Sequence, residues 1–410
     1  MAAPDAHLLW LSAKVPNDQF LLFVFDGTPN PSAVKDIYRR AEAMDELRLR
    51  VRDEGPWRYP RWIPGAVRPE QFVLHEGVAA QWQDCLDTVA RLADRQLDAT
   101  EMAWRVHVLP LAKQCVVVVQ IAHALGDGTR SAALAAALLG RPGPISDVAV
   151  PQRGSLLWRS VVAARAHRRL VADTEAGLLP AAGQTRPPLS VNARPGRRSA
   201  MRVIPTARER LAGPTVTVGA LVAISEALGG YLADRGEDVS NLCAEVPMAF
   251  EFGQEYGPSI QAHNNFRNVS VGLHPQVPRP ERAVRIAAEL DGHRVRARHA
   301  ATRSSVAAFA AVPAAVLRWG VRQFDPSVRP GAVSGHTVVS SVNRGPADLS
   351  FGGRPVLLTA GFPALSPNMG LTHGVHGIGE TVAIGVHADP DVVDVDAYAE
   401  RLACALRHPY

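Results

Sequence analysis

A histidine followed four residues later by an aspartate and a glycine is the segment of this chain best suited to do chemistry. His123, Asp127 and Gly128 lie in the stretch Ala-His-Ala-Leu-Gly-Asp-Gly, which begins at Ala122. A neutral imidazole has a pKa of about 6.5, so His123 can take a proton from a hydroxyl that attacks an activated acyl carbon. The pattern therefore predicts His123 as the general base of an acyl transfer.

The segments on either side of this motif must hold the histidine in place. The apolar run 115–121 predicts a buried strand, and the Ala/Leu-rich run 131–139 predicts a helix. His123 would then lie on the turn between them, where a rigid scaffold can present a side chain to a substrate. Gly128 permits a close backbone approach that a Cβ would forbid. Asp127 could relay a proton, but on so tight a turn we expect it to point back and support the loop.

Other catalytic signatures are absent from the sequence. It has no Gly-x-Ser-x-Gly elbow, no phosphate-binding loop, no dinucleotide fingerprint and no His-Glu-x-x-His motif. His373 and His376 lie on a glycine-rich stretch without a cysteine or carboxylate at ligand spacing, which favours loop histidines over a metal site. We expect no metal in this protein.

Composition indicates a large globular protein with two domains. The chain has 410 residues, of which 47% are hydrophobic and 20% charged. No secretion signal is visible, and the four widely spaced cysteines predict reduced thiols in a cytoplasmic protein: Cys85, Cys115, Cys243 and Cys404. The formal net charge is +5, and only three of the 44 basic residues are lysine. The arginines form either a solvated surface or a patch for anionic lipid or CoA phosphates; their scatter argues against nucleic acid.

Periodicity predicts a mixed α/β chain in two parts. We expect an N-terminal domain over 1–145, a Pro/Gly-rich crossover linker over 146–196 and a C-terminal domain over 197–410. Apolar spacing predicts helices over 31–49, 78–93, 131–139, 155–174, 216–232 and 283–298. Alternating or continuous apolar runs predict strands over 20–25, 104–109, 114–121, 200–204, 242–247, 268–273, 338–342 and 381–387.

The His123-x-x-x-Asp127-Gly128 motif resembles the active-site motif of the CoA-dependent acyltransferase superfamily, which includes chloramphenicol acetyltransferases and peptide-synthetase condensation domains. Further landmarks resemble the bacterial wax ester synthase/diacylglycerol acyltransferase family. Each is weak by itself, but they occur in the family's order along nearly the whole chain: 4–9, 97–104, 188–192, 264–269 and 340–346.

The resemblance implies a fold, a reaction and a set of site residues. The fold would be α/β, with two chloramphenicol-acetyltransferase-like two-layer domains around a central tunnel. His123 would be the base that moves a long acyl chain from acyl-CoA to diacylglycerol or a long-chain alcohol, with peripheral contact to a membrane or lipid droplet. The thioester is already activated, so acyl-CoA would be a co-substrate and no cofactor is expected. The candidate tunnel contacts are Trp104, Asn264, Asn265 and Asn268.

Several positions depart from the family pattern. Ala122 stands where the family has a first histidine, and Thr217-Val218 aligns with an Asn-Asp pair, so we expect both polar groups to be lost. The Pro-Gly-Pro turn is replaced by a segment that includes Arg344. Two alternatives therefore remain open. One is a condensation-type or natural-product acyltransferase with another acceptor or a carrier-bound donor, and the other is a catalytically silent acyl-CoA- or lipid-binding relative.

Overall fold

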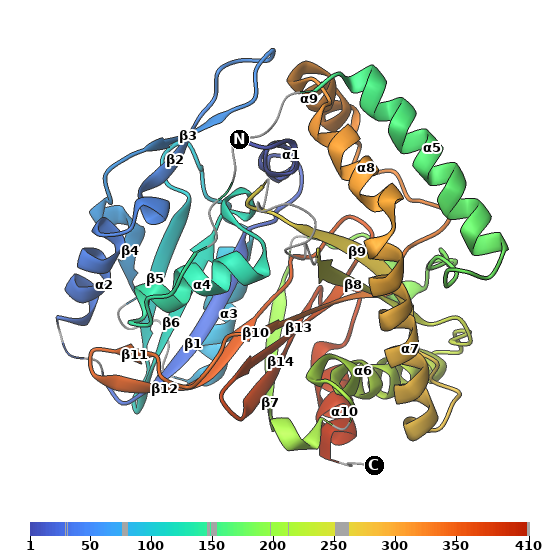
Figure 1. Ribbon diagram of the computed structural model, residues 1–410. Helices are drawn as coiled ribbons and strands as arrows, with labels where there is room; N and C mark the ends of the chain where they lie inside the picture. The colour runs from blue at the N-terminus through green and yellow to red at the C-terminus, as the bar shows by residue number, and fades with distance from the viewer. Residues whose placement is uncertain are drawn as a thin grey trace.

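Two mixed sheets lie side by side in the computed structural model, each with helices packed against it (Figure 1). The structure describes residues 1–28, 30, 32–75, 81–145, 148, 154–196, 198–211, 213–250 and 262–407. Within these residues each of the two sheets has six strands, and a separate hairpin forms a two-stranded sheet. The predicted fold class is therefore confirmed at the level of secondary structure and layers.

The first sheet has the order β11-β12-β1-β6-β5-β4. Its strands are β1 (Gln19–Asp26), β4 (Phe72–Leu74), β5 (Trp104–Pro110), β6 (Gln114–Ile121), β11 (Ser350–Phe351) and β12 (Arg354–Gly361). The continuous valine run of β6 is buried, because helices α2 (Ala33–Glu42) and α4 (Gly128–Leu138) cover one face and α3 (Trp82–Ala93) covers the other. This burial fixes the end of β6, which leads directly to His123.

The second sheet has the order β7-β14-β13-β10-β8-β9. Its strands are β7 (Ala200–Ala207), β8 (Cys243–Ala249), β9 (Phe266–Gly272), β10 (Thr337–Asn343), β13 (Leu371–Ile378) and β14 (Thr381–Ala388). Its apolar core is shared with α6 (Val216–Ala233), α7 (Arg279–Arg298) and α10 (Val395–Arg407). By length and composition α6 could span a membrane, but most of it is buried in this core.

Two late strands complete the first sheet. β12 pairs antiparallel with β1, for example Leu22 opposite Ala360, and β11 pairs with β12. The polypeptide therefore returns from the second half into the first, which locks the two halves together. The predicted domain boundaries at 145 and 197 stay a prediction, and this crossover is a feature that they did not include.

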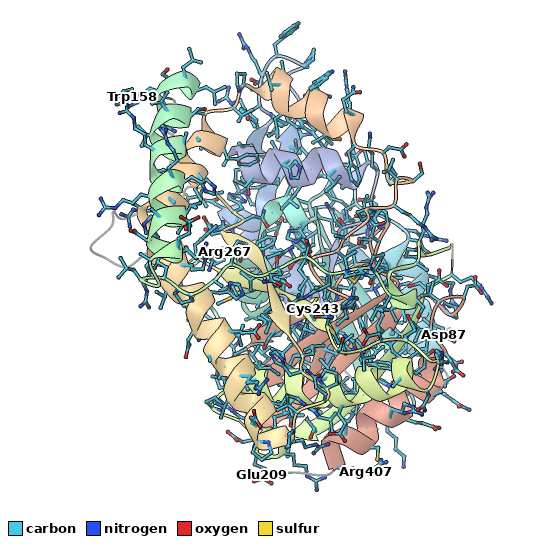
Figure 2. The ribbon with its side chains drawn as sticks, turned by 90° about the vertical axis from the view of Figure 1, so that its right-hand side faces the viewer. Asp87, Trp158, Glu209, Cys243, Arg267 and Arg407 are labelled. Carbon is cyan, nitrogen blue, oxygen red and sulfur yellow. The ribbon has the colours of Figure 1, made fainter. Side chains whose placement is uncertain are left out.

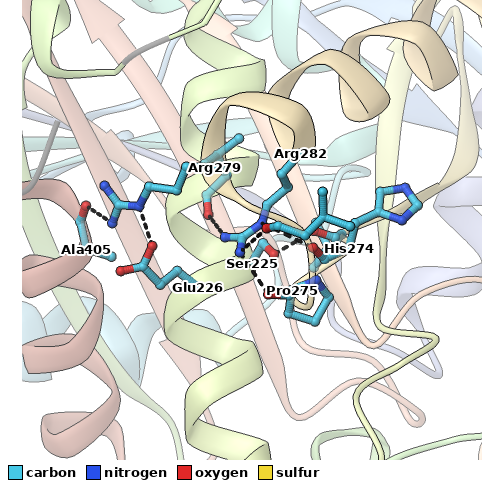
Figure 3. Close-up of polar contacts among 10 residues, drawn as sticks. Ser225, Glu226, His274, Pro275, Arg279, Arg282 and Ala405 are labelled. Carbon is cyan, nitrogen blue, oxygen red and sulfur yellow. Dashed lines mark hydrogen bonds and ion pairs between the residues drawn. The ribbon is translucent and has the colours of Figure 1, made fainter. Parts of the chain in front are cut away.

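A buried arginine clamps the connection between β9 and α7. Arg282 donates to the carbonyls of His274, Pro275 and Val277, and to that of Val222 in α6 (Figure 3). His274 has a positive φ of 47°, a conformation that this dense set of contacts holds in place. All three guanidinium nitrogens of Arg282 contact backbone oxygens, so this arginine is structural.

The remaining helices flank the two sheets. They are α1 (Ala3–Ser12), α5 (Leu156–Glu175), α8 (Ala300–Ala310) and α9 (Ala314–Gln323), and the separate hairpin is β2 (Leu49–Arg52) with β3 (Arg61–Pro64). Helix α5 has no buried residue and packs along α8 at the outside of the molecule (Figure 1). Helices α8 and α9 meet at an angle of 95°.

Most predicted elements coincide with observed ones, and the differences have local causes. The helix predicted over 31–49 ends at Glu42, where the chain turns into a short 3-10 helix before β2. The predicted loop histidines His373 and His376 instead lie in β13, because two alternating faces of that strand are buried. Val78 and Arg197, at the predicted starts of a helix and of the C-terminal domain, lie outside the described residues.

Candidate active site

His123 lines a cavity of about 370 Å³ that is open to solvent between the two sheets. It lies on a 3-10 turn, His123–Leu125, directly after β6. The cavity wall comes from both halves of the chain, with residues of β1 on one side and of β8, β9 and β10 on the other. The sequence motif thus lies at a cavity that residues of both sheets enclose.

Asn264 contacts the imidazole of His123. The Asn264 Oδ1 lies 2.9 Å from His123 Nδ1, and the ring stacks on Phe266 with centroids 5.7 Å apart. The contact joins residues 141 positions apart and so bridges the two halves of the chain. It leaves Nε2 as the nitrogen that can act on a substrate.

The orientation of the Asn264 amide decides which nitrogen of His123 carries the proton. Its Nδ2 donates to Asp5 Oδ1 at 3.0 Å and to the backbone oxygen of His123 at 2.8 Å. Both partners are acceptors, so the amide nitrogen must face them and Oδ1 must face the imidazole. Because Oδ1 only accepts, His123 donates from Nδ1, and Nε2 of the neutral ring keeps its lone pair.

Burial tunes both ionisable groups of this network. It lowers the pKa of His123 below its usual value, although the hydrogen bond to Asn264 opposes the effect. Burial also raises the pKa of Asp5 to about 6, against hydrogen bonds from Asn264 and from the backbone N–H of His263. At neutral pH the imidazole is therefore uncharged and Asp5 is a carboxylate, which are the states that the proton arrangement requires.

Asp127 and Gly128 support the turn that carries His123. Asp127 caps α4: Oδ1 accepts the backbone N–H groups of Thr129 and Arg130 at 3.1 and 3.0 Å. Its Oδ2 accepts the N–H of Asn265 from the other half of the chain at 3.0 Å. A Cβ on Gly128 would lie 3.0 Å from a methyl carbon of Val342, which explains the glycine. This geometry supports the loop role that we expected for both residues.

The three other predicted tunnel contacts lie in different places. They are Asn268, Asn265 and Trp104. Asn268 lines the cavity and donates to Glu245 at 2.5 Å. Asn265 uses its side chain to donate to the carbonyl of Ala262 and is not part of the cavity wall. Trp104 corrects our expectation of a tunnel contact: it is fully buried, and its indole N–H donates to the carbonyl of Leu47 at 2.7 Å. The first position of β5 faces the apolar core beneath α2 and α4, so this ring packs and does not reach a substrate.

Ser341 is a site residue that the sequence analysis missed. It lines the cavity from β10, and the hydroxyl of Thr217 donates to its Oγ at 2.9 Å. Because its Oγ accepts from Thr217, Ser341 keeps its own O–H available as a donor at the cavity wall. Thr217 also corrects the expectation that both polar groups of the Thr217-Val218 pair are lost, since only Val218 is an apolar core residue. The adjacent Ser340-Ser341 pair was the available sequence signal.

The comparisons with known proteins agree with this architecture. Residues 263–408 match the family described as the WS/DGAT C-terminal domain. This C-terminal segment is therefore similar to the C-terminal domain of wax ester synthase/diacylglycerol acyltransferases. The resemblance expected from the sequence is confirmed, and the matched segment begins at His263, next to Asn264. No curated protein sequence matches the chain.

Two solved structures of low sequence identity share the fold of this chain over nearly its whole length. The wax ester synthase/diacylglycerol acyltransferase of Marinobacter aquaeolei VT8 superposes with a TM-score of 0.62 at 16% identity, over 98% of this chain and 97% of that one. The starter condensation domain of rhizomide synthetase in complex with C8-CoA gives 0.60 at 16% identity, over 100% and 95%. The two-domain, chloramphenicol-acetyltransferase-like fold is therefore confirmed.

A buried carboxyl in the cavity wall is expected to make the stability of this protein depend on pH. Asp18 lines the cavity of His123 and a smaller neighbouring one of about 170 Å³. Its Oδ2 accepts from the backbone N–H of Leu97 and from the amide of Gln120, but burial still raises its pKa to about 7. The folded state therefore holds a proton that the unfolded chain releases near pH 4, and stability falls as the pH rises toward 7.

We expect Asp18→Asn to stabilise the protein by about 1 to 3 kcal/mol at pH 8, because the amide avoids a buried charge. Thermal unfolding at pH 5 and pH 8 measures the effect. The gain should shrink at pH 5, where the native Asp18 is already protonated. The control Asp26→Asn, at the exposed end of β1, should give no such difference. An equal gain at both pH values would contradict the account.

Proposed function

We propose that this protein is an O-acyltransferase that moves a long acyl chain from acyl-CoA to a lipid hydroxyl, of the kind found in diacylglycerol or a long-chain alcohol. The observation that carries the proposal is the contact of His123 Nδ1 with Asn264 Oδ1, which favours a proton on Nδ1 and a lone pair on Nε2 of a ring that lines the cavity. A general base in this state contributes about 10²- to 10⁴-fold to rate.

The reaction follows from the groups around the cavity. His123 Nε2 takes the hydroxyl proton while the hydroxyl oxygen forms a bond to the thioester carbon. The carbonyl oxygen becomes an oxyanion, which accepts a hydrogen bond from Ser341. When the tetrahedral intermediate collapses, the C–S bond breaks and the imidazolium returns its proton to the departing thiolate. The products are an ester and free CoA, and His123 is neutral again.

Two alternative functions would use the same cavity in different ways. A condensation-type or natural-product acyltransferase would use a carrier-bound donor or another acceptor, and a starter condensation domain with C8-CoA shares this fold. A silent acyl-CoA- or lipid-binding relative would bind without turnover. The basic Nε2 favours a working enzyme over the silent relative, since a binding protein has no need of a fixed imidazole tautomer.

A thiol-release screen of the purified protein tests the proposal. Acyl-CoA and acyl-carrier protein are offered in turn with diacylglycerol, fatty alcohols and small alcohols, and free thiol and ester are measured together. Release that requires both acyl-CoA and a hydroxyl acceptor supports the assignment. Release from the carrier alone would select the condensation-type alternative, and binding without product at every acceptor would select the silent one.

We also propose that the protein is cytoplasmic and contacts an anionic lipid surface through one face. This α5–α9 face consists of the exposed apolar side chains on α5, α8 and α9: Leu157, Trp158, Phe309, Val316 and Trp319. Figure 2 shows Trp158 at the outer edge of α5. Segments 156–172 and 300–324 hold seven arginines and no carboxylate. Exposed tryptophans between arginines suit the headgroup region of an anionic membrane.

Replacing both tryptophans of this face by aspartate, Trp158→Asp with Trp319→Asp, is expected to weaken binding to anionic vesicles by about 10-fold or more, since each ring contributes apolar area and each new charge is repelled. Co-sedimentation with phosphatidylglycerol-containing vesicles measures the binding. Val284→Asp alters an equally exposed apolar side chain on α7 and serves as control. Equal losses in the control and the double variant would contradict the assignment of the face.

A further inference from the structure

A second charged group shares the cavity with His123. Arg344 follows β10, is only 4% exposed, and lines the same cavity. Burial lowers the pKa of its guanidinium to about 9, so it is still a cation at neutral pH. A cation buried beside a reaction site requires an explanation, because transferring an unpaired charge out of water is costly.

The protein gives Arg344 partners but no counter-charge among the described residues. Nη1 donates to the hydroxyl of Thr359 and more weakly, at 3.4 Å, to the carbonyl of Leu22; the guanidinium lies 5.0 Å from the ring centroid of Phe23. Its Nε is buried without a hydrogen-bond partner. The buried Arg282 differs, because its Nε and both Nη atoms reach backbone carbonyls (Figure 3).

His376 adds a second unpartnered group at the same place. It lines the cavity from β13, is 6% exposed, and its Nδ1 is buried without a hydrogen-bond partner. A Cβ on Gly361 would lie 2.6 Å from His376 Cε1 and 2.9 Å from Arg344 Nη2, so the two side chains meet over that glycine. Burial and the adjacent guanidinium lower the pKa of His376, which keeps the ring neutral. One cation and one neutral imidazole thus line the cavity, and each has a buried nitrogen without a hydrogen-bond partner.

We propose that Arg344 and His376 bind an oxyanion of the acyl acceptor, so that the substrate carries a carboxylate or a phosphate in addition to its hydroxyl. The inference rests on the acyl transfer of the proposed function and replaces its neutral lipid acceptor with a hydroxy acid or a phosphate-bearing alcohol. A guanidinium and an imidazole N–H are suitable donors for either group. The phosphates of CoA are separated from the thioester by the pantetheine arm, which leaves the acceptor as the source of an anion deep in the cavity.

Matched acceptor pairs test this assignment. The first pair is a hydroxy acid and its methyl ester. The second pair is a phosphate-bearing alcohol and its neutral parent. The native protein should prefer the anionic member. In Arg344→Met the ratio of kcat/KM for anionic over neutral acceptor should fall by about 10²- to 10³-fold, the cost of removing one side of a buried charge pair. Arg401→Met, which alters an exposed arginine on α10, should leave the ratio unchanged. The pair whose kcat/KM ratio falls more in Arg344→Met shows whether the bound anion is a carboxylate or a phosphate.

Two further arms separate the outcomes. With an acyl-N-acetylcysteamine donor, which has no phosphates, the effect of Arg344→Met must persist; its disappearance would make the CoA phosphates the ligand and overturn the proposal. Thermal shift supplies a readout without catalysis: the hydroxy acid should raise the Tm of the native protein more than its ester does, and Arg344→Met should remove this difference. A shift without any thiol release would refute the proposed function alone. Equal shifts and rates for acid and ester would refute this inference alone.

Discussion

Replacing His123 by alanine is expected to lower thiol release from acyl-CoA by about 10²- to 10⁴-fold in the presence of an accepted hydroxyl substrate. The rate is lost because alanine has no nitrogen that can take the hydroxyl proton. In the native protein Asn264 holds the ring proton on Nδ1 of His123, which leaves Nε2 to accept the hydroxyl proton. A chromogenic thiol assay measures the rate. Since burial lowers the pKa of His123, the native rate should fall only as the pH drops through that lowered value, and the variant should lack this limb.

The control for this variant is His75→Ala, which removes a half-buried imidazole whose ring contacts His107 at the far edge of the first sheet. It should retain the native rate. Binding of acyl-CoA to His123→Ala is measured by thermal shift. A rise in Tm would show that the cavity of the variant is intact. Native turnover in a folded His123→Ala protein would mean that another group removes the hydroxyl proton.

Replacing Asn264 by leucine is expected to reduce kcat by about 10²-fold with a smaller change in KM for acyl-CoA, because the imidazole is no longer held with its proton on Nδ1. Leucine has a similar shape but cannot accept from His123 or donate to Asp5. The ¹⁵N chemical shifts of the His123 ring report the tautomer directly. They should show Nδ1–H in the native protein and a mixture in the variant.

Asp5→Asn distinguishes positioning from mere packing. Every described group that contacts the Asp5 carboxylate is an N–H donor, from His263 or Asn264, so an asparagine here must turn its own amide nitrogen toward one of them. The expected result is a partial loss of the Nδ1–H tautomer and a smaller loss of kcat than in Asn264→Leu, because the His123 carbonyl still accepts from the Asn264 Nδ2. A slower enzyme with the native tautomer in both variants would show that Asn264 only packs.

The motif residues could be predicted from sequence because their geometry is local. His123, Asp127 and Gly128 lie on one turn between a buried strand and a helix, and a four-residue spacing specifies that turn. Asn264 was named as a cavity residue, but its contact with His123 spans 141 positions and its contact with Asp5 spans 259. No periodicity reports such pairs, so the proton arrangement could not be predicted from the sequence.

Side-chain direction explains the other differences. Trp104 begins a strand in which either face was open to assignment, and the packing of α2 and α4 selects the core. Thr217 was judged by comparison with an Asn-Asp pair, yet a single hydroxyl suffices to bind Ser341. Arg344 had no local pattern that could place it in the cavity, because β12 and β13 approach it from more distant parts of the chain.

The return of β11 and β12 into the first sheet limits how this polypeptide can evolve by exchange of modules. A recombination event in the crossover between the halves would give the N-terminal sheet an edge from a foreign parent, since residues 350–361 travel with the other gene segment. Asp127 and Asn265 would be separated in the same event. We therefore expect relatives of this chain to be inherited whole. If two of them exchange an N-terminal half, β11 and β12 should be exchanged with it.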